Sequence, residues 1–304
     1  MKVLVTGANG QTGWELSKGE GRKSFDILPL DRATLDITDQ REVNRQVRGA
    51  GVSLVVNAAA YTAVDQAESE AELAFAVNRE GPAYLASACA EAGIPLIHIS
   101  TDFVFDGKKQ GPYLEWDQIS PLNVYGKSKA AGEVAVRERL REHIIVRTSW
   151  VYGVQGNNFV KTMLRMGRER NVIQVVDDQY GCPTWAADLG DMIMGIADQI
   201  REKKEITWGT YHYCGRGVTS WHGLAQEIFS LARQYTSLKV EKVQAIRTAD
   251  YPTPAERPLN SALDCSLVEK TFNIHPQPWR ESLAQMIKML FSVEKSNKSQ
   301  KIIV

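Results

Sequence analysis

Short runs of β-branched and aliphatic residues alternate with helix-forming stretches through the first half of the chain. The predicted strands are residues 2–6, 25–30, 52–57, 95–100 and 144–148. The predicted helices between them are residues 14–18, 63–91 (with a break near residues 81–82) and 130–141. Because two parallel strands must be joined by a crossover, which is usually a helix, this alternation predicts βαβ units. We therefore expect an α/β protein with a parallel sheet.

Three glycines follow the first predicted strand at once. Gly7, Gly10 and Gly13 have the spacing G-x-x-G-x-x-G, which differs from the commoner dinucleotide signature G-x-G-x-x-G. Glycine permits a tight turn and lets backbone N–H groups approach a pyrophosphate, where a helix N-terminus adds partial positive charge. An ordinary surface turn is the alternative. The position between the first strand and the first helix favours a Rossmann-type doubly wound sheet that binds a dinucleotide.

An acidic residue ends the second predicted strand. Asp31 can accept hydrogen bonds from the adenosine ribose hydroxyls, which favours NAD(H). Arg32 beside it could hold a 2′-phosphate and admit NADP(H). Asp36 and Ile37 could flank the adenine, although Asp36 is also suited to capping a helix. The sequence therefore leaves both NADPH and NADH open as the cofactor.

Tyr125 and Lys129 are four residues apart, so on a helix they share a face. A free tyrosine has a pKa near ~10, and a nearby ammonium lowers that pKa. A phenol tuned in this way can give a proton to a carbonyl oxygen while hydride reaches the carbon. The lysine can also hydrogen-bond the nicotinamide ribose. A solvated helix face is the alternative for an isolated Y-x-x-x-K pair.

A third polar element lies at the end of the predicted strand 95–100. Ligands of doubly wound sheets bind at the carboxyl ends of the strands. The Thr101 hydroxyl is placed there, where it could donate to a substrate carbonyl and stabilise developing charge. Capping of the next turn is the alternative for this hydroxyl. We expect His98, in the same strand, to be a core residue and not a catalyst.

The composition excludes several classes of partner. The 36 Lys and Arg residues balance the 36 Asp and Glu residues, which argues against nucleic acid because polyanion binders carry a basic excess. No apolar run reaches the ~18–20 residues that span a bilayer, and the first residues do not form a signal peptide. The cysteines and histidines show no ligand spacing. We expect four free thiols, no metal site and a cytoplasmic location.

Together these motifs resemble those of the extended short-chain dehydrogenase/reductases. The shared features are the glycine turn, the alanines after strand 52–57, the Ser/Thr strand end and Y-x-x-x-K. Longer strings resemble one branch of that family, the dTDP-4-dehydrorhamnose reductases. These strings are residues 57–65, 100–105, 121–126, 147–152, 156–159, 178–181, 251–258 and 260–261. The resemblance covers residues 1 to about 292.

The resemblance implies reduction of the 4-keto group of dTDP-4-dehydro-L-rhamnose by NADPH or NADH. The product, dTDP-L-rhamnose, is a precursor of cell-surface polysaccharide. In this scheme Tyr125 is the proton donor, Lys129 its electrostatic partner and Thr101 the third catalytic member. The residues implied to line the cofactor are Gly7, Gly10, Gln11, Thr12, Gly13, Asp31, Arg32, Asp36, Ile37, Ala58, Ala60, Tyr61, Thr62, Tyr125 and Lys129. Those implied to contact the nucleotide-sugar substrate are Thr101, Asp102, Trp150, Asn158 and Arg257.

Two of the substrate residues also have a chemical argument of their own. Trp150 ends a predicted strand, and its aromatic face suits packing against a sugar ring or methyl group, with a core tryptophan as the alternative. Arg257 lies in the Pro- and Arg-rich loop 251–258, and its guanidinium fork fits diphosphate oxygens. An ordinary surface arginine is the alternative there.

One departure from the family pattern affects assembly. Some members bind magnesium at a dimer interface through glutamates. Glu15 matches the first of these, but Ala187 stands where another carboxylate is required. An incomplete ligand set holds Mg²⁺ poorly. We therefore expect no structural magnesium, and both a monomer and a homodimer stay open.

The second half of the chain is less regular and predicts a smaller, mixed C-terminal substrate domain. Its predicted helices are residues 157–170, 188–201, 220–235 and 281–292, with a strand at residues 172–176. We expect residues 1–154 to form the NAD(P)-binding domain, with residues 172–177 and 186–216 returning to it. The remaining assignments are the substrate-binding region, at residues 155–171, 178–185 and 217–292, and a polar tail at residues 293–304.

Alternative functions keep the fold and change the chemistry. One is a reductase of a different nucleotide sugar. A remoter one is an epimerase or dehydratase, for which Asp102 beside Thr101 could serve as an acid. Another is a regulatory subunit that binds NADP and catalyses nothing. The presence of Thr101, Tyr125 and Lys129 argues against the last of these.

Overall fold

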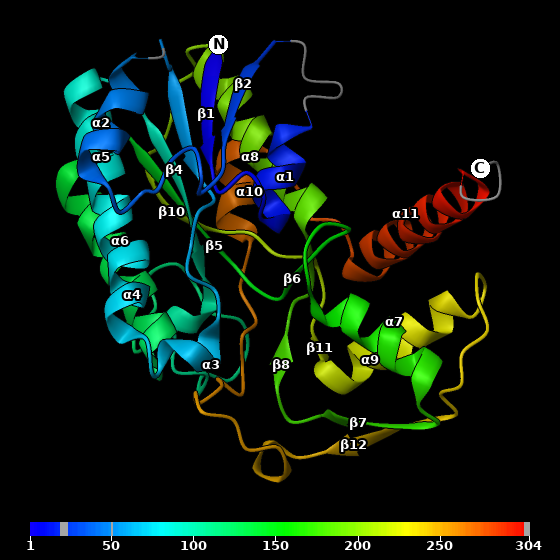
Figure 1. The fold of residues 1–304 in the computed structure, drawn as a ribbon. Helices are drawn as coiled ribbons and strands as arrows, with labels where there is room; N and C mark the ends of the chain where they lie inside the picture. The colour runs from blue at the N-terminus through cyan, green and yellow to red at the C-terminus, as the bar shows by residue number, and fades with distance from the viewer. Residues whose placement is uncertain (19–23, 50, 301–304) are drawn as a thin grey trace.

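A computed structural model describes residues 1–18, 24–49 and 51–300. Within these residues a six-stranded parallel sheet has the order β10-β5-β4-β3-β1-β2 (Figure 1). Its strands are β1 (Lys2–Thr6), β2 (Asp26–Leu30), β3 (Leu54–Asn57), β4 (Leu96–Thr101), β5 (His143–Thr148) and β10 (Gly209–His212). The chain passes from β1 to β2 on one side and continues with β3 on the other. The switch point, where doubly wound sheets bind ligands, therefore lies between β1 and β3.

Helices cover both faces of this sheet, as the alternation of strands and helices predicts (Figure 1). One face carries α2 (Gln40–Gly49), α5 (Gly81–Ala92) and α6 (Val124–Arg139), packed through residues such as Val43, Leu85 and Val136. The other carries α1 (Gln11–Ser17), α8 (Ala186–Arg201) and α10 (Ser266–Phe272), packed through Leu16, Ile193 and Val268. Every residue of β3 and β5 is buried. Strands covered on both faces are buried along their length in this way.

Capping moves the start of α6 six residues before the predicted start. The Asn123 side chain accepts a hydrogen bond from the Gly126 N–H at 2.8 Å, which satisfies a free amide of the first turn. Tyr125 and Lys129 therefore both lie on this helix. The predicted break near residues 81–82 is instead a π-helical turn (Ala76–Glu80) between α4 (Ala71–Phe75) and α5. Pro82 is tolerated in the first turn of α5, where its missing N–H costs little.

A second lobe lies below and to the side of the sheet (Figure 1). Its helices are α7 (Phe159–Glu169), α9 (Trp221–Ala232) and α11 (Trp279–Gln300). Short strand pairs complete it: β7 (Val172–Val176) with β12 (Lys242–Ile246), β6 (Val151–Tyr152) with β9 (Thr184–Trp185), and β8 (Tyr180–Gly181) with β11 (Thr219–Ser220). A separate apolar cluster, which includes Leu164, Phe229 and Leu283, forms its core.

Two predicted assignments between the lobes are wrong. Residues 172–177 do not return to the first sheet, because β7 pairs in parallel with β12 and buries Ile173 in the second core. Within the stretch 217–292, α10 belongs to the first lobe, where Phe272 packs edge-on against Tyr211 at 4.9 Å. The tail also differs from the prediction: α11 continues to Gln300, and residues 301–304 lie outside the described residues.

Three cysteines that are distant in the sequence meet in one small core. Cys182, Cys214 and Cys265 belong to or contact the same cluster, and the Sγ atoms of Cys214 and Cys265 are 3.6 Å apart. All four cysteines of the chain are free thiols. Among the described residues, no group of three or more His, Cys, Asp or Glu side chains has an arrangement that could hold a metal ion. No described helix is long and apolar enough to cross a membrane.

Candidate active site

The glycine turn after β1 is built by the close approach of backbone segments. Gly7 has a φ of +67°, and its carbonyl accepts a hydrogen bond from the Gly10 N–H at 2.9 Å. A Cβ on Gly13 would lie 2.1 Å from that same carbonyl oxygen, so no other residue fits there. No side chain of the described residues caps the N-terminus of α1, whose first residues are Gln11 and Thr12. The turn therefore presents backbone amides to an anion, as a pyrophosphate requires.

The loop after β3 forms the wall opposite the glycine turn in the smaller cavity. Buried polar groups hold it in place, because the Ala59 N–H donates to Asn57 Oδ1 at 3.2 Å and Thr6 Oγ1 donates to the same oxygen at 2.6 Å. A cavity of about 250 Å³ opens between the two walls. Predicted residues that line it are Gly7, Gly10, Arg32, Asp36, Ile37, Ala58, Ala60 and Tyr61. Its place at the switch point and its lining suit the adenosine half of a dinucleotide.

Asp31 and Arg32 have different surroundings at the end of β2. The Asp31 carboxylate accepts hydrogen bonds from Thr34 Oγ1 and Asn9 Nδ2, both at 2.8 Å. These bonds, with those from Thr34 contributing most, hold the pKa of Asp31 below its usual value. The Arg32 side chain is 77% exposed and pairs only loosely with Asp36, at 3.6 Å. The carboxylate is thus fixed and ionised, whereas the guanidinium is free to turn toward a ligand.

The three predicted catalytic residues come together where α6 passes the end of β4. Tyr125 and Lys129 lie on one face of α6, and the Tyr125 hydroxyl lies close to the Thr101 side chain. Thr101 Oγ1 also donates to Asp102 Oδ1 at 2.9 Å, and Lys129 Nζ donates to the Ile99 carbonyl at 2.7 Å. All of these side chains are buried. His98, which directly precedes Ile99 in β4, is a fully buried core residue.

Burial dominates the proton affinities of this cluster. It raises the pKa of Tyr125 to about 12 and that of Asp102 to about 6, and it lowers the pKa of Lys129 to about 8. The pKa of Tyr125 is therefore raised overall, against the lowering expected from its spacing to Lys129. The Lys129 ammonium is directed to the Ile99 carbonyl instead. Tyr125 is a neutral phenol at neutral pH, which suits a proton donor.

The pKa of Lys129 sets an expected alkaline limit on activity. Its ammonium is present at pH 7 and is lost as the pH rises through about 8, so kcat should fall along that limb. A pH–rate profile between pH 6 and 10 measures this. The Lys129→Met variant should be slow throughout and lack the limb. A variant profile that still falls near pH 8 would assign the limb to another group.

A residue absent from the predictions ties the cofactor wall to the catalytic helix. Asn78 lies on the π-helical turn and is completely buried. Its Oδ1 accepts from the Tyr61 N–H at 2.9 Å, and its Nδ2 donates to the Tyr61 carbonyl and to Ser128 Oγ. Ser128 Oγ in turn donates to the Tyr125 carbonyl at 2.8 Å. The π-helical geometry is the only signal for Asn78, and it is not visible in the sequence. Thr62, next to Tyr61, is exposed.

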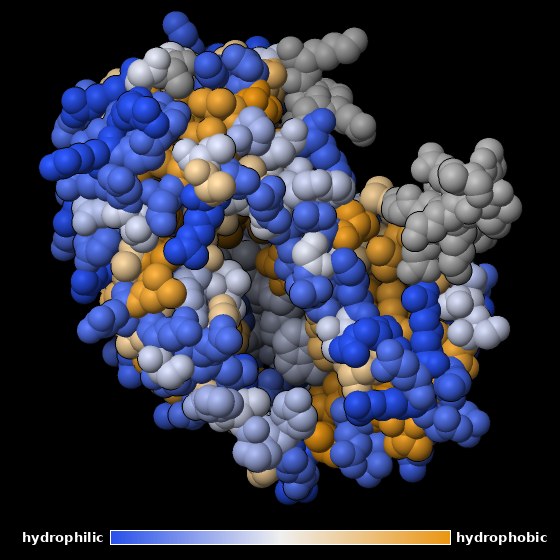
Figure 2. Space-filling model, in the orientation of Figure 1, coloured by the Kyte–Doolittle hydropathy of each residue, from blue (hydrophilic) through white to orange (hydrophobic). Residues whose placement is uncertain are grey.

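A larger cavity of about 810 Å³ lies between the lobes, where the surface is hollowed (Figure 2). Trp150 lines it in a backbone conformation with a φ of 48° and stacks on Trp221 at 3.6 Å. Gly181 makes room for this indole, because a Cβ there would lie 2.5 Å from the ring. Trp221, which the sequence analysis does not single out, is thus half of the aromatic wall. Such a wall suits a ring-shaped ligand.

Arg257 lies at the same cavity but already has a partner. Its Nη2 donates to Asp65 Oδ2 at 2.8 Å, and its Nη1 donates to the Ala255 carbonyl at 3.0 Å. Asp65 comes from α3 (Val64–Ala67) of the first lobe and also accepts from the Ala255 N–H. Both charged side chains line the cavity. The pair therefore holds a guanidinium at the cavity with N–H groups left over for an anion.

Asn158 does not line the larger cavity. Its Oδ1 accepts from the Lys161 N–H and caps α7, and its Nδ2 donates to Gln11 Oε1 and the Gly153 carbonyl. Its position contradicts the expectation of a direct substrate contact, because every side-chain donor is already used. Asn158 instead supports the segment that carries the cavity wall, through its hydrogen bonds to Gln11, Gly153 and Lys161.

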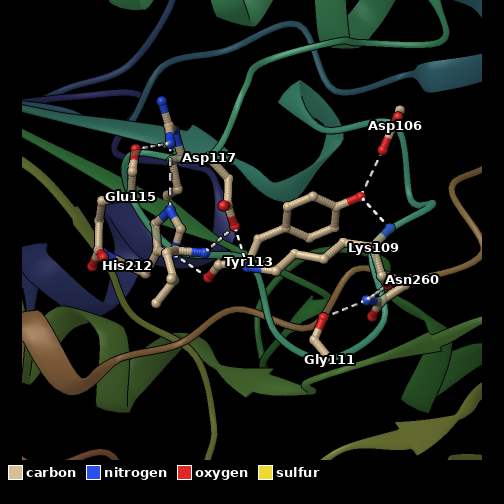
Figure 3. A network of polar contacts seen from close by, with 10 residues as sticks. Asp106, Lys109, Gly111, Tyr113, Glu115, Asp117, His212 and Asn260 are labelled. Carbon is tan, nitrogen blue, oxygen red and sulfur yellow. Dashed lines mark hydrogen bonds and ion pairs between the residues drawn. The ribbon is translucent and has the colours of Figure 1, made fainter.

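The segment after Asp102 is held in place by a polar network (Figure 3). Tyr113 Oη donates to Asp106 at 2.7 Å, and Glu115 Oε1 accepts from the His212 N–H at 3.0 Å. Asn260 Nδ2 donates to the Lys109 and Gly111 carbonyls, both at 2.8 Å. This network fixes the neighbouring Ser261, which lines the larger cavity beside Asp102.

Comparisons with known proteins match nearly the whole chain. The model of the family described as RmlD substrate binding domain matches residues 1–292. A protein of Sinorhizobium fredii named dTDP-4-dehydrorhamnose reductase is 44% identical over 288 residues, covering 94% of this chain and 97% of that protein. A Clostridium acetobutylicum structure with that name has a TM-score of 0.89 at 39% identity, covering 95% and 99%. A Bacillus anthracis structure, in complex with NADP, has a TM-score of 0.88 at 39% identity over the same shares.

Proposed function

The chain belongs to the RmlD substrate binding domain family, and from this membership we propose which of its residues carry out the family's reaction. It is an NAD(P)H-dependent oxidoreductase that reduces the 4-keto group of dTDP-4-dehydrorhamnose to give dTDP-rhamnose. One observation carries the assignment of roles. Tyr125 packs in one small cluster with Tyr61, which lines the smaller cavity, and Phe103, which lines the larger one. The proton donor thus stands at the junction of the cofactor and substrate cavities.

The residues divide the chemistry between them. The reduced nicotinamide, when bound, supplies the hydride. Tyr125, kept neutral by burial, gives its phenolic proton to the keto oxygen. The Thr101 hydroxyl turns its single proton from Asp102 to the same oxygen and stabilises the negative charge that develops there. Lys129 is close enough to restore the electrostatic balance when Tyr125 becomes a phenolate, because it lies one turn along the same helix face.

The proposal also assigns the substrate and its surroundings. The nucleotide sugar fills the larger cavity, with the sugar against Trp150 and the diphosphate near Arg257. Asp102, which is buried beside the cavity residue Ser261, contacts the sugar in this proposal. The apolar wall that α7 contributes, including Met163 and Met166, accommodates the base. Glu15 is already paired with Lys18 at 2.7 Å, which supports an assembly without structural magnesium. We place the enzyme in the cytoplasm as a monomer or homodimer, and sedimentation with and without EDTA tests the assembly.

A coupled assay tests the function directly. dTDP-4-dehydro-L-rhamnose is generated in situ, this protein is added, and absorbance of the reduced nicotinamide is followed with NADPH and NADH in parallel. Oxidation of the cofactor with formation of dTDP-rhamnose is the expected result. Binding of NADPH without any oxidation would instead indicate a different sugar nucleotide or a non-catalytic role.

The Asp31→Ala variant tests the cofactor wall. Removing the fixed carboxylate should weaken NADH more than NADPH, because a 2′-phosphate replaces the ribose hydroxyl that Asp31 binds. The KM values for the two cofactors, measured with saturating sugar nucleotide, report the difference. Thr34→Val is the matched control, since it removes a hydrogen bond to Asp31 and leaves the carboxylate in place. Equal loss of both cofactors in Asp31→Ala would remove Asp31 from the ribose contact.

A further inference from the structure

The side chain of Gln11, in the cofactor turn, makes its hydrogen bonds to residues of the second lobe. Gln11 begins α1 within the glycine turn. Its Oε1 accepts from Asn158 Nδ2 at 3.0 Å, and its Nε2 donates to the Val151 carbonyl at 3.3 Å. The chain wraps around it, because a Cβ on Gly156 would lie 3.5 Å from Gln11 Cγ. The backbone of Gln11 therefore follows Gly10, which lines the smaller cavity, and its side-chain amide supports residues that carry a wall of the larger cavity.

Gln11 holds residues 151–158, and the elements at both ends of this segment line the larger cavity. Trp150 precedes residues 151–158, and α7 follows them. Both elements line the cavity, α7 through residues that include Phe159, Thr162 and Met163. Asn158 closes the segment on itself by capping α7 and donating to the Gly153 carbonyl at 2.7 Å. A displacement of Gln11 therefore moves the aromatic wall and the start of α7 together.

We propose that Gln11 is a positioning residue that couples cofactor binding to nucleotide-sugar binding. The inference rests on the proposed function of the two cavities. A cofactor pyrophosphate on the turn restrains the Gln11 backbone, and the two amide hydrogen bonds pass that restraint to residues 150–159. The wall formed by Trp150 and α7 then loses less conformational entropy when the nucleoside diphosphate binds. The second ligand therefore binds more tightly. The coupling is reciprocal, and each ligand tightens the other by one common factor.

Calorimetry with dTDP as the probe measures this factor. In the wild-type protein, saturating NADP⁺ should lower the Kd of dTDP by about fivefold or more, and dTDP should lower the Kd of NADP⁺ equally. Gln11→Met keeps the length of the side chain and removes both amide hydrogen bonds. We expect the coupling factor of this variant, the ratio of the dTDP Kd values without and with saturating NADP⁺, to be near one. In turnover, the KM for the sugar nucleotide should rise by a larger factor than kcat falls.

Asn158→Ser provides the matched partner variant. Serine keeps an acceptor that caps α7, but it removes the donor to Gln11. If the two residues act through one bond, the Gln11→Met/Asn158→Ser double variant should lose no more coupling than the worse single variant. Thermal unfolding of each variant separates this effect from loss of structure.

Each outcome has a distinct meaning. Coupling that survives in Gln11→Met overturns the inference. Wild-type protein that binds both ligands independently overturns the inference and leaves the proposed function intact. Wild-type protein that does not bind dTDP at all overturns both.

Discussion

Replacement of Tyr125 with phenylalanine should lower kcat by roughly 10²- to 10⁴-fold, the usual contribution of a positioned general acid. In the proposed mechanism the phenol is the proton donor at the junction of the two cavities, and burial keeps it protonated by raising its pKa to about 12. Phenylalanine retains the ring, which packs edge-on against Phe103 at 5.5 Å. Only the hydroxyl is lost. The Kd of NADPH should therefore stay close to the wild-type value.

Steady-state kinetics and fluorescence titration of NADPH measure the two quantities separately. Tyr84→Phe, which removes the same atom from α5 on the first lobe, is the control and should be fully active. A Tyr125→Phe enzyme with wild-type kcat would show that the proton comes from elsewhere. Asp102 is then the nearest candidate, since burial raises its pKa to about 6.

Removing the charge of Glu133 should destabilise the fold by about 3–5 kcal/mol, the cost of leaving a buried charge without its partner. Glu133 and Arg147 are both fully buried and meet at 2.7 Å. Ser100 Oγ also donates to Glu133, and the Arg147 guanidinium lies over the Phe105 ring. In Glu133→Gln the shape is kept, but the Arg147 cation loses its counter-charge between α6 and β5.

Denaturant unfolding of the wild type and Glu133→Gln gives this difference directly. Glu42→Gln is the control, because Glu42 pairs with the exposed Arg45 and such surface pairs contribute about 0–1 kcal/mol. The Glu133→Met/Arg147→Met double variant should recover much of the loss, since it removes both charges. A Glu133→Gln protein as stable as the control would mean that the buried pair is not what holds α6 to β5.

The difference should also depend on pH. Burial alone would raise the pKa of Glu133, but the hydrogen bonds and charge of Arg147 outweigh it and hold the pKa below its usual value. The stabilisation is therefore complete above the unfolded-state value of about 4.3 and is lost as the pH falls through the lower folded-state pKa. The stability gap between the wild type and Glu133→Gln should shrink on acidification through this range.

Much of the first lobe could be predicted from local sequence alone. The central strands are short aliphatic runs, and a strand covered on both faces has no other pattern available. Gly7, Gly10 and Gly13 identify the cofactor turn because only glycine permits that backbone approach. Tyr125, Lys129 and Thr101 could be grouped because the helix period and the parallel strand ends place them at one edge.

The parts that were missed depend on partners far away in the chain. β12 and β7 pair through backbone hydrogen bonds between residues about seventy positions apart. The sequence of neither strand by itself indicates which strand it pairs with. Asp65 meets Arg257 and Gln11 meets Asn158 between the lobes, and Trp221 meets Trp150 within the second lobe. Such contacts follow from how two cores dock, which no local periodicity encodes.

The sequence by itself determined the chemistry available to this protein: a dinucleotide turn, a phenol, an ammonium and a hydroxyl at one sheet edge. The tertiary structure alone decided the state of those groups. Burial sets the direction of the Tyr125 pKa shift and opposes the effect expected from the spacing to Lys129. The reason is physical. Residue spacing determines which groups can meet, whereas proton affinity and cavity shape depend on the dielectric surroundings and packing supplied by segments distant in the chain.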